Sequence, residues 1–382
     1  MIPGPTPVPD AVLRTLSEDP MGHRTKEFSK LLTETSASLK KLAECEGDVF
    51  TLTSSGTGAM EAAICNTISP GDKVLSVVCG NFGERWAKIA EAFGATVDRL
   101  KVENGEAASV DALRERLLAD KDRAIKAVTI THNETATGVI NDLQQLALAV
   151  REHGALCIVD AVTSFGATPI SFTEWGIDVM VCGSQKALML PPGLAFIFVG
   201  ERFWESNAKC KSPRFYYDLS KYKDSMEQDT TPFTPNVSFV AALKLSLDMM
   251  KQEGYPQVFA RHERLKRATR AGVLGMGLKL FVTKETAASP TITAIYPPAS
   301  ISVDSIRRGL KERFEIRVAD GQNELKSKIF RIGHMGYVFE RDILMTLAAL
   351  EAVLMELGYR CPAGIGVGSA LPELIAKEQS PA

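Results

Sequence analysis

Apolar residues recur along this chain in two periods that alternate from residue 49 onward. Short runs rich in Val, Ile, Leu and Phe have the length of buried strands, and most are followed by a segment with the 3.6-residue spacing of an amphipathic helix. The runs predict seven strands, at 49–52, 73–79, 96–102, 127–131, 156–160, 179–182 and 194–199. The intervening segments predict helices at 59–68, 84–93, 110–118 and 143–152. This alternation indicates an α/β fold with a mostly parallel, seven-stranded sheet covered by helices.

The strand at 194–199 should break the parallel order. It follows the turn Pro191-Pro192-Gly193, which is too short for a crossover connection, so we expect this strand to run antiparallel. After it, residues 210–235 are rich in Tyr, Pro and Thr and are expected to be irregular, before a long helix at 237–252.

A chain of 382 residues exceeds the size at which one core keeps growing, so more than one domain is expected. Residues 1–20 should form an N-terminal arm, because the Pro-rich start cannot be helical. A large domain should span 21–253, and a small α+β domain 254–382. Within the small domain, the apolar pattern predicts helices at 258–273, 303–313 and 341–356 and strands at 291–296 and 329–332. Residues from Gly364 onward follow the last predicted helix and are expected to be a flexible tail.

Composition and charge exclude several classes of partner. The net charge is −2 and basic blocks are missing, so neither nucleic acid nor an anionic membrane is indicated. No apolar run reaches the length of a membrane span, and the first residues lack the features of a signal peptide. Seven scattered cysteines without a C-x-x-C pair favour reduced thiols in a cytoplasmic protein. Five histidines without ligand spacing do not indicate a metal site.

Three strand ends carry the candidate chemistry. One strand ends in Asp160, and the next ends in a tight turn followed by Lys186, so both groups should stand at one edge of the sheet, where α/β proteins bind ligands. The turn 54–58, SSGTG, opens a helix whose free N–H groups suit a phosphate. Each feature also has an ordinary explanation: an acid that caps a turn, a solvated loop lysine, and a plain helix cap. Together they are the parts needed to hold pyridoxal 5′-phosphate (PLP).

The sequence resembles the fold-type I, class V PLP-dependent aminotransferases, and most closely the alanine–glyoxylate and serine–glyoxylate group. The similarity runs from Pro3-Gly4-Pro5-Thr6 almost to residue 360. It is carried by SSGTGAME (54–61), GNFGERW (80–86), THNETATGV (131–139), VDAVTSFG (159–166), GSQKAL (183–188) and FRIGHMG (330–336).

The resemblance implies a role for individual residues toward PLP. Lys186 would form the Schiff base with the cofactor and shuttle a proton, and Asp160 would pair with the pyridine nitrogen. The remaining cofactor contacts that it implies are Ser55, Gly56, Thr57 and Gln185 at the phosphate, Phe82 and Val162 on the two ring faces, and Thr135 at the ring hydroxyl or the polar network around Asp160. Asn133 and Glu134 are weaker candidates, because loop polarity alone would explain them.

Substrate and assembly are implied in the same way. Arg331 would bind the substrate carboxylate through its two-pronged guanidinium, although a structural salt bridge would also explain an arginine in an apolar strand. Gly4 would let the backbone of the arm approach the substrate. Relatives form homodimers with the sites at the interface, where Thr230 would contact the phosphate of the partner's cofactor. Many relatives carry a tyrosine where this chain has Glu227. His23 and Arg24 fit either a pocket or an interface.

The favoured hypothesis is a ping-pong transaminase that moves the amino group of alanine or serine to a small 2-oxo acid, glyoxylate. One alternative is a cysteine desulfurase or lyase, which needs a nucleophilic cysteine on a mobile loop; the corresponding region, 318–328, contains none. Another alternative is a non-catalytic PLP-binding subunit of a complex.

Overall fold

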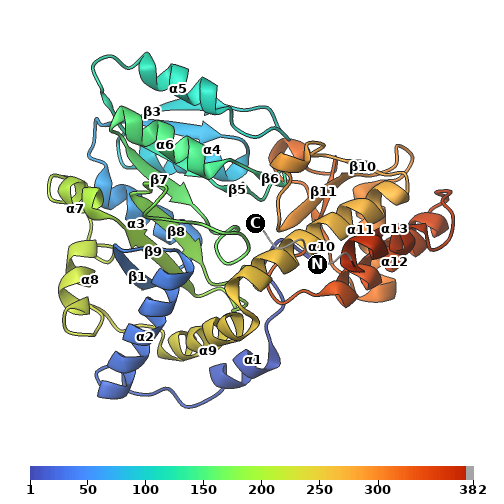
Figure 1. The fold of residues 1–382 in the computed structure, drawn as a ribbon, viewed down its shortest axis with the longest axis horizontal. Coiled ribbons are helices and arrows are strands. Elements are labelled where there is room, and N and C mark those ends of the chain that lie inside the picture. Colours follow the sequence, from blue (N-terminus) through green and yellow to red (C-terminus); the bar gives the residue numbers. More distant parts are fainter. Residues whose placement is uncertain (376–382) are drawn as a thin grey trace.

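Two sheets organise the chain in the structure, a computed structural model that describes residues 1–375 (Figure 1). The first sheet has seven strands in the order β1-β9-β8-β7-β4-β2-β3. Their bounds are β1 Asp48–Thr53, β2 Lys73–Val78, β3 Thr96–Lys101, β4 Ile125–Thr131, β7 Leu156–Asp160, β8 Val179–Gly183 and β9 Leu194–Val199. β9 is antiparallel to both of its neighbours and the other pairs are parallel, which confirms the predicted exception.

Helices bury this sheet on both faces. Alternate residues of β7 point to opposite sides, so that Cys157 and Val159 join one core while Leu156 and Ile158 join another. Every residue of β7, β8 and β9 is buried, as expected for strands covered twice. The helices of this part are α2 Lys26–Leu42, α3 Gly56–Thr67, α4 Asn81–Ala92, α5 Val110–Leu118, α6 Leu143–His153, α7 Glu201–Asn207, α8 Leu219–Met226 and α9 Val237–Glu253. The short pair β5 Asn133–Glu134 and β6 Val139–Ile140 follows β4.

The expectation that residues 210–235 are irregular is wrong at α8. Asp218 caps this helix by accepting a hydrogen bond from the N–H of Ser220, and Leu219 and Tyr222 are buried beneath it. The helix was missed because its apolar stripe, Leu219, Tyr222 and Met226, spans only eight residues within a segment rich in Tyr, Pro and Thr.

The second sheet has four antiparallel strands in the order β10-β11-β13-β12. α9 leads to it through Gly254, whose φ of 92° ends that helix immediately before α10. The elements are α10 Tyr255–Gly275, β10 Lys279–Leu280, β11 Ile292–Tyr296, α11 Val303–Phe314, β12 Ala319–Asp320, β13 Phe330–Gly333, α12 Glu340–Glu356 and α13 Ile365–Ile375. They enclose a third core of their own. The division into domains at residues 20 and 253 stays a prediction.

The predicted flexible tail is also wrong as far as residue 375, because Ile365–Ile375 forms the helix α13. Small residues let α13 lie close against α10: a Cβ added at Gly272 would come 2.8 Å from the carbonyl oxygen of Gly366. Glu351 accepts hydrogen bonds from the N–H groups of Gly364 and Gly366, where the helix begins. Gly272 and Gly366 therefore mark a helix contact that the sequence alone did not reveal.

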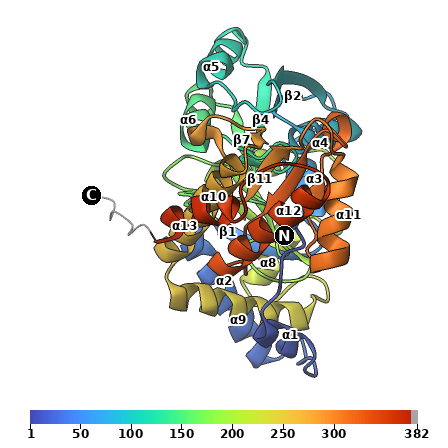
Figure 2. The same ribbon diagram turned by 90° about the vertical axis from the view of Figure 1, so that its right-hand side faces the viewer.

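The N-terminal arm joins the two sheets. The N–H of Gly333, at the end of β13, donates to the carbonyl oxygen of Met1 (2.9 Å), and the N–H of Thr6 donates to that of Gln185 (3.3 Å). Only Asp10–Leu16 (α1) is helical within the first 20 residues. Figure 2 shows the N-terminus beside α12, against the C-terminal part of the chain.

The other sequence expectations concern cysteines and membranes. All seven cysteines are free thiols in the structure. No helix within residues 1–375 combines the length and apolarity needed to cross a bilayer.

Two glycine substitutions test the contact between α10 and α13. Gly272→Ala places a Cβ 2.8 Å from the carbonyl oxygen of Gly366 in α13 and 2.5 Å from the side chain of Leu347 in α12, so it should lower the free energy of unfolding by about 1–2 kcal/mol despite the better helix propensity of alanine. At Gly368, within α13, an added Cβ meets no atom of residues 1–375 within 4 Å, so Gly368→Ala should raise the free energy of unfolding by about 0.5–1 kcal/mol. Urea denaturation of both variants measures the difference. Equal effects of the two substitutions would contradict the close contact.

Candidate active site

The ends of β7 and β8 bring the acid and the lysine together. Asp160 is the last residue of β7, and β8 ends at Gly183, three residues before Lys186. The two strands are parallel neighbours, with Asp160 opposite Val181, so their carboxyl ends share one edge of the sheet. Both side chains line a cavity of about 180 Å³. Its other lining residues are Ser55, Gly56, Thr57, Met60, Phe82, Arg85, Thr135, Val162, Thr163 and Gln185.

The turn before α3 forms one wall of this cavity. Ser55 is the N-cap of α3, and its hydroxyl accepts a hydrogen bond from the N–H of Gly58 (3.3 Å). A Cβ at Gly56 would lie 2.8 Å from a methyl group of Val162, so only glycine fits there without displacement. Arg85 donates a hydrogen bond to the hydroxyl of Thr57 (2.9 Å). A helix N-terminus with an arginine beside it is suited to hold an anion.

Asp160 is a buried carboxylate with little compensation. It is 4% exposed, and Oδ1 accepts a hydrogen bond from the N–H of Val162 (2.8 Å). Burial raises the pKa of Asp160 to about 6, and the nearby charges of Arg85 and Lys186 oppose this rise. A buried carboxylate at a strand end is placed to bind a positively charged partner in the cavity.

The Lys186 amine lies under the N-terminal arm. Nζ donates a hydrogen bond to the carbonyl oxygen of Pro3 (2.6 Å). A Cβ at Gly4, whose φ is 128°, would come 2.5 Å from Nζ, so glycine allows the arm to pass this close. Burial lowers the pKa of Lys186 to about 8; Asp160 opposes this change and Arg331 adds to it. A large fraction of the amine is therefore neutral in mildly alkaline solution.

Apolar and unsatisfied groups complete the first cavity. Phe82, in the first turn of α4, and Val162, two residues beyond Asp160, both line it. The guanidinium of Arg85 lies 4.6 Å from the centre of the Phe82 ring. The hydroxyl of Thr135 donates to that of Thr163 (3.2 Å). The side-chain oxygen of Gln185 is buried without a hydrogen-bond partner in the structure, which is the state expected of a group that faces a ligand.

Arg331 enters from the second sheet. It lies on β13 and is 4% exposed. Nε and Nη2 donate to the carbonyl oxygen of Asp320 (2.9 and 2.6 Å), and Nη1 donates to that of Thr135 (2.7 Å). A guanidinium has five N–H groups, so each terminal nitrogen keeps one for another acceptor. The alternative of a structural salt bridge does not fit these contacts, because all three hydrogen bonds go to backbone carbonyl oxygens.

A second cavity, of about 600 Å³, connects Arg331 with the first. Both cavities are lined by Phe82, Thr135 and Lys186. The other residues around the second are Ile2, Pro3, Gly4, Arg307, Lys311, Arg317, Val318, Ala319, Asp320, Gly321, Gln322 and Arg331. The predicted site residues therefore meet in two adjoining compartments, one beside Asp160 and one beside Arg331.

Thr230 is not among the residues that line either compartment. Its hydroxyl accepts a hydrogen bond from Arg24 (2.7 Å), and Arg24 also donates to the carbonyl oxygen of Thr231. Glu227 is the C-cap of α8. Arg24 thus ties the start of the chain to the segment after α8, and its role at an interface stays a prediction.

Sequence reasoning did not select three residues that line the first cavity, namely Arg85, Met60 and Thr163. Arg85 could have been found, because it lies within GNFGERW and follows Phe82 by three residues on a helix, which places both on one face. Thr163 gave a weaker signal, since a threonine in a turn has many ordinary explanations.

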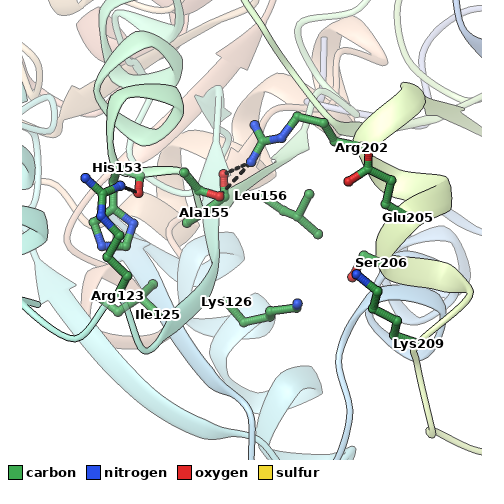
Figure 3. Close-up of a pocket in the computed structure, with 11 residues that line it drawn as sticks. Arg123, Ile125, Lys126, His153, Ala155, Leu156, Arg202, Glu205, Ser206 and Lys209 are labelled. Atoms are coloured by element: carbon green, nitrogen blue, oxygen red, sulfur yellow. Dashed lines mark hydrogen bonds between the residues drawn. The ribbon is translucent and has the colours of Figure 1, made fainter.

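Another cavity, of about 330 Å³, lies at the opposite edge of the sheet (Figure 3). Lys126 points across its opening toward Ser206, and Arg202 donates hydrogen bonds to the carbonyl oxygens of Gly154 and Ala155. Leu156, the first residue of β7, lines it, so it is at the end of β7 remote from Asp160. Ligands of α/β sheets bind at the carboxyl ends of the strands, which favours the Asp160 edge as the active site.

Comparison with known proteins decides the family. Residues 3–336 match the family model of class-V aminotransferases. The chain belongs to the class-V aminotransferases. This confirms the predicted family, the aminotransferase activity and the fold-type I architecture.

Three relatives illustrate the similarity. The chain is 49% identical over 372 residues to the soluble hydrogenase 42 kDa subunit of Anabaena cylindrica, with 97% of each chain covered. It is 35% identical to the serine–glyoxylate aminotransferase of Arabidopsis thaliana, with 97% of this chain and 93% of that protein covered. The crystal structure of the ureidoglycine–glyoxylate aminotransferase of Bacillus subtilis superimposes with a TM-score of 0.93 at 32% identity, covering 98% of this chain and 97% of that one.

Class-V aminotransferases are PLP-dependent, and the residues present fit this cofactor. The first cavity offers a helix N-terminus for a phosphate, a buried carboxylate for a protonated ring nitrogen and an amine for an aldehyde. The partnerless oxygen of Gln185 and the glycine at position 56, where a Cβ would crowd Val162, indicate a cavity shaped for a ligand.

Replacing Asp160 with Asn in the cofactor-free protein should show how much the buried carboxylate lowers the free energy of unfolding. The pKa of Asp160 is raised in the folded state. The stability that its protonated form contributes is therefore fully present below about pH 4 and is lost as the pH rises through about 6. Asn resembles the protonated form. Asp160→Asn should therefore be more stable than the wild type at pH 7, by up to about 3 kcal/mol, with the difference vanishing near pH 4. Urea denaturation at both pH values measures this, and a pH-independent difference would contradict the burial argument.

Proposed function

We propose that this aminotransferase moves the amino group of alanine or serine to glyoxylate in a ping-pong reaction at a single site. The observation that carries the proposal is the pair of adjoining cavities. Lys186 lines both, with Asp160 on one side and Arg331 on the other. A cofactor and a substrate carboxylate can thus be held on either side of one amine.

The cofactor would be held by residues from five segments. The residues proposed to bind the phosphate are Ser55, Gly56, Thr57 and Gln185. Asp160 would keep the ring nitrogen protonated, Phe82 and Val162 would cover the ring faces, and Thr135 would contact the ring hydroxyl. When bound, PLP supplies an electron sink for the carbanion that forms at the substrate Cα.

Lys186 would be the base that moves the proton. Its Nζ would take the proton from the substrate Cα and return one at the cofactor carbon. A general base works best when its pKa lies near the working pH, and a pKa of about 8 meets this condition. Removing water from around the amine also strengthens its interaction with Asp160.

Arg331 would select substrates by their carboxylate. One N–H remains on each terminal nitrogen, which permits two parallel hydrogen bonds to a carboxylate. Gly4 lets the N-terminal arm pass close to Lys186, and the arm would then close one side of the proposed substrate compartment. The two relatives named as transaminases share glyoxylate in their names but differ in the amino compound, which supports the acceptor more strongly than the donor.

The oligomeric state is proposed from the resemblance to the family. We propose a cytoplasmic homodimer in which Thr230 of each chain contributes to the partner's phosphate site. The division into an arm (1–20), a large domain (21–253) and a small domain (254–382) is proposed with it. In this division β13 belongs to the small domain, which must lie against the first sheet for Arg331 to reach the site.

A second candidate is a PLP-binding subunit without transaminase activity. The relative named as a hydrogenase subunit is the observation that favours it. A desulfurase is not supported, because residues 318–328 contain no cysteine.

A half-reaction screen tests the function. Purified holoprotein should lose the absorption band of lysine-bound PLP when alanine or serine is added, and glyoxylate should restore it. Lys186→Ala should bind PLP through its phosphate yet show neither change, because the amine is missing. Stopped-flow absorbance measures both steps. A wild-type band that no amino acid bleaches would support the non-catalytic subunit, and sulfide released from cysteine would support a desulfurase.

The salt dependence of the two half-reactions should differ. Five basic side chains and one carboxylate line the second cavity: Lys186, Arg307, Lys311, Arg317, Arg331 and Asp320. Glyoxylate is an anion, whereas alanine and serine are zwitterions. The second-order rate constant for glyoxylate should fall several-fold between low salt and about 0.2 M, because the Debye length shortens to about 8 Å or less, while that for alanine changes little. Lys311→Gln should flatten the glyoxylate dependence; equal salt dependence for both substrates would contradict a positive entrance.

A further inference from the structure

Glu134 is a buried carboxylate to which the proposed mechanism gives no role. It is fully buried at the end of β5, just beyond the strand that precedes the site. Oε2 accepts hydrogen bonds from the N–H groups of Phe82 (2.9 Å) and Gly83 (3.2 Å), and Oε1 accepts one from Ala136 (3.0 Å). All of its partners are backbone groups of two segments that border the cavities.

The first two contacts fix the start of α4. Its N-cap, Gly80, has no side chain to satisfy the N–H groups of the first turn, which every helix leaves without an internal partner. Glu134 supplies the cap from another element. A Cβ at Gly80 would come 2.4 Å from Cγ of Glu134, so glycine is what lets the carboxylate approach. The capped turn carries Phe82, which lines both cavities.

The third contact fixes the turn that follows Glu134. By accepting from Ala136, the carboxylate holds the peptide group between Thr135 and Ala136, which carries the carbonyl oxygen of Thr135. The carbonyl oxygen of Thr135 accepts the Nη1 hydrogen bond of Arg331 (2.7 Å), and its side chain lines both cavities. One carboxylate thus orients Phe82 and, through Thr135, Arg331.

We propose that Glu134 is a positioning residue that fixes the cofactor-binding side of the site relative to the substrate-binding side, an inference that rests on the proposed function. Its chemistry suits the task. Three N–H groups converge on two oxygens, and an ionised carboxylate accepts from all of them. An amide at this position would turn an NH₂ group toward one of the donors and lose that contact.

The experiment compares Glu134→Gln and Glu134→Asp with Asp178→Asn. Asp178 serves as the control: it is buried (4% exposed) and precedes β8 at the opposite edge of the sheet, and its carboxylate accepts from the N–H of Cys157 (2.7 Å) and from Arg202 (3.2 Å). The readouts are the PLP dissociation constant, the visible circular dichroism of bound PLP, the concentration dependence of the alanine half-reaction, and amide hydrogen exchange of residues 81–84 in the cofactor-free protein.

Both Glu134 variants should weaken PLP binding and raise the half-saturating alanine concentration about tenfold or more, the cost seen when such supporting contacts are removed. They should also reduce the circular dichroism of bound PLP and speed exchange at Phe82 and Gly83. Glu134→Asp keeps the charge but is one methylene too short, so it should behave like Glu134→Gln. Asp178→Asn should change stability while leaving these site readouts within twofold.

Normal PLP binding, dichroism and alanine dependence in a folded Glu134→Gln protein would overturn the proposal, as would the same losses in Asp178→Asn. Failure of the proposed function has a different signature. The wild type would then show no amino-acid half-reaction, whereas PLP affinity and exchange at residues 81–84 would still report whether Glu134 positions α4.

Discussion

The site depends on one unfavourable placement, the burial of the Asp160 carboxylate at the end of β7. Within residues 1–375 its one hydrogen bond comes from a backbone N–H, and burial shifts its pKa upward, so the folded protein bears a free-energy cost there that a neutral residue would avoid. Groups held at such a cost are typical of functional sites. The cost is tolerable because β7 lies at the centre of a sheet buried on both faces, and its neighbour β8 brings Lys186 to the same edge.

The rest of the chain completes this pair from separate directions. The N-terminal arm places the carbonyl oxygen of Pro3 on the Lys186 amine and is itself bonded to β13. The second sheet supplies Arg331, whose guanidinium is oriented by the carbonyl oxygen of Asp320, on β12, and by that of Thr135, in the turn between β5 and β6. The second cavity therefore exists only while the arm and the two sheets are docked together. The proposed transamination uses both cavities at once, so one edge of the first sheet would not be enough for it.

Much of this could be predicted from the sequence. Strand runs ending in Asp160 and before Lys186 gave the sheet edge, because a buried parallel strand is a continuous apolar run with an abrupt polar end. The short turn at Pro191–Gly193 gave the antiparallel β9. The misses have physical causes. The apolar stripe of α8 is only eight residues long, and that of α13 is interrupted by glycines and Pro372; α13 is held by a glycine contact to α10 that only the tertiary structure brings together. Glu134 was interpreted as a polar loop residue. Its three hydrogen-bond partners are backbone N–H groups, which the amino-acid sequence does not identify.

The most direct test of the central claim is to locate the covalent bond. Holoprotein is reduced with borohydride, digested, and searched by mass spectrometry for the peptide that carries the phosphopyridoxyl group. The account predicts the label on Lys186 alone, at the edge of the sheet that Asp160 shares. A label on Lys126, at the opposite edge, or on any other lysine with Lys186 unmodified, would contradict it.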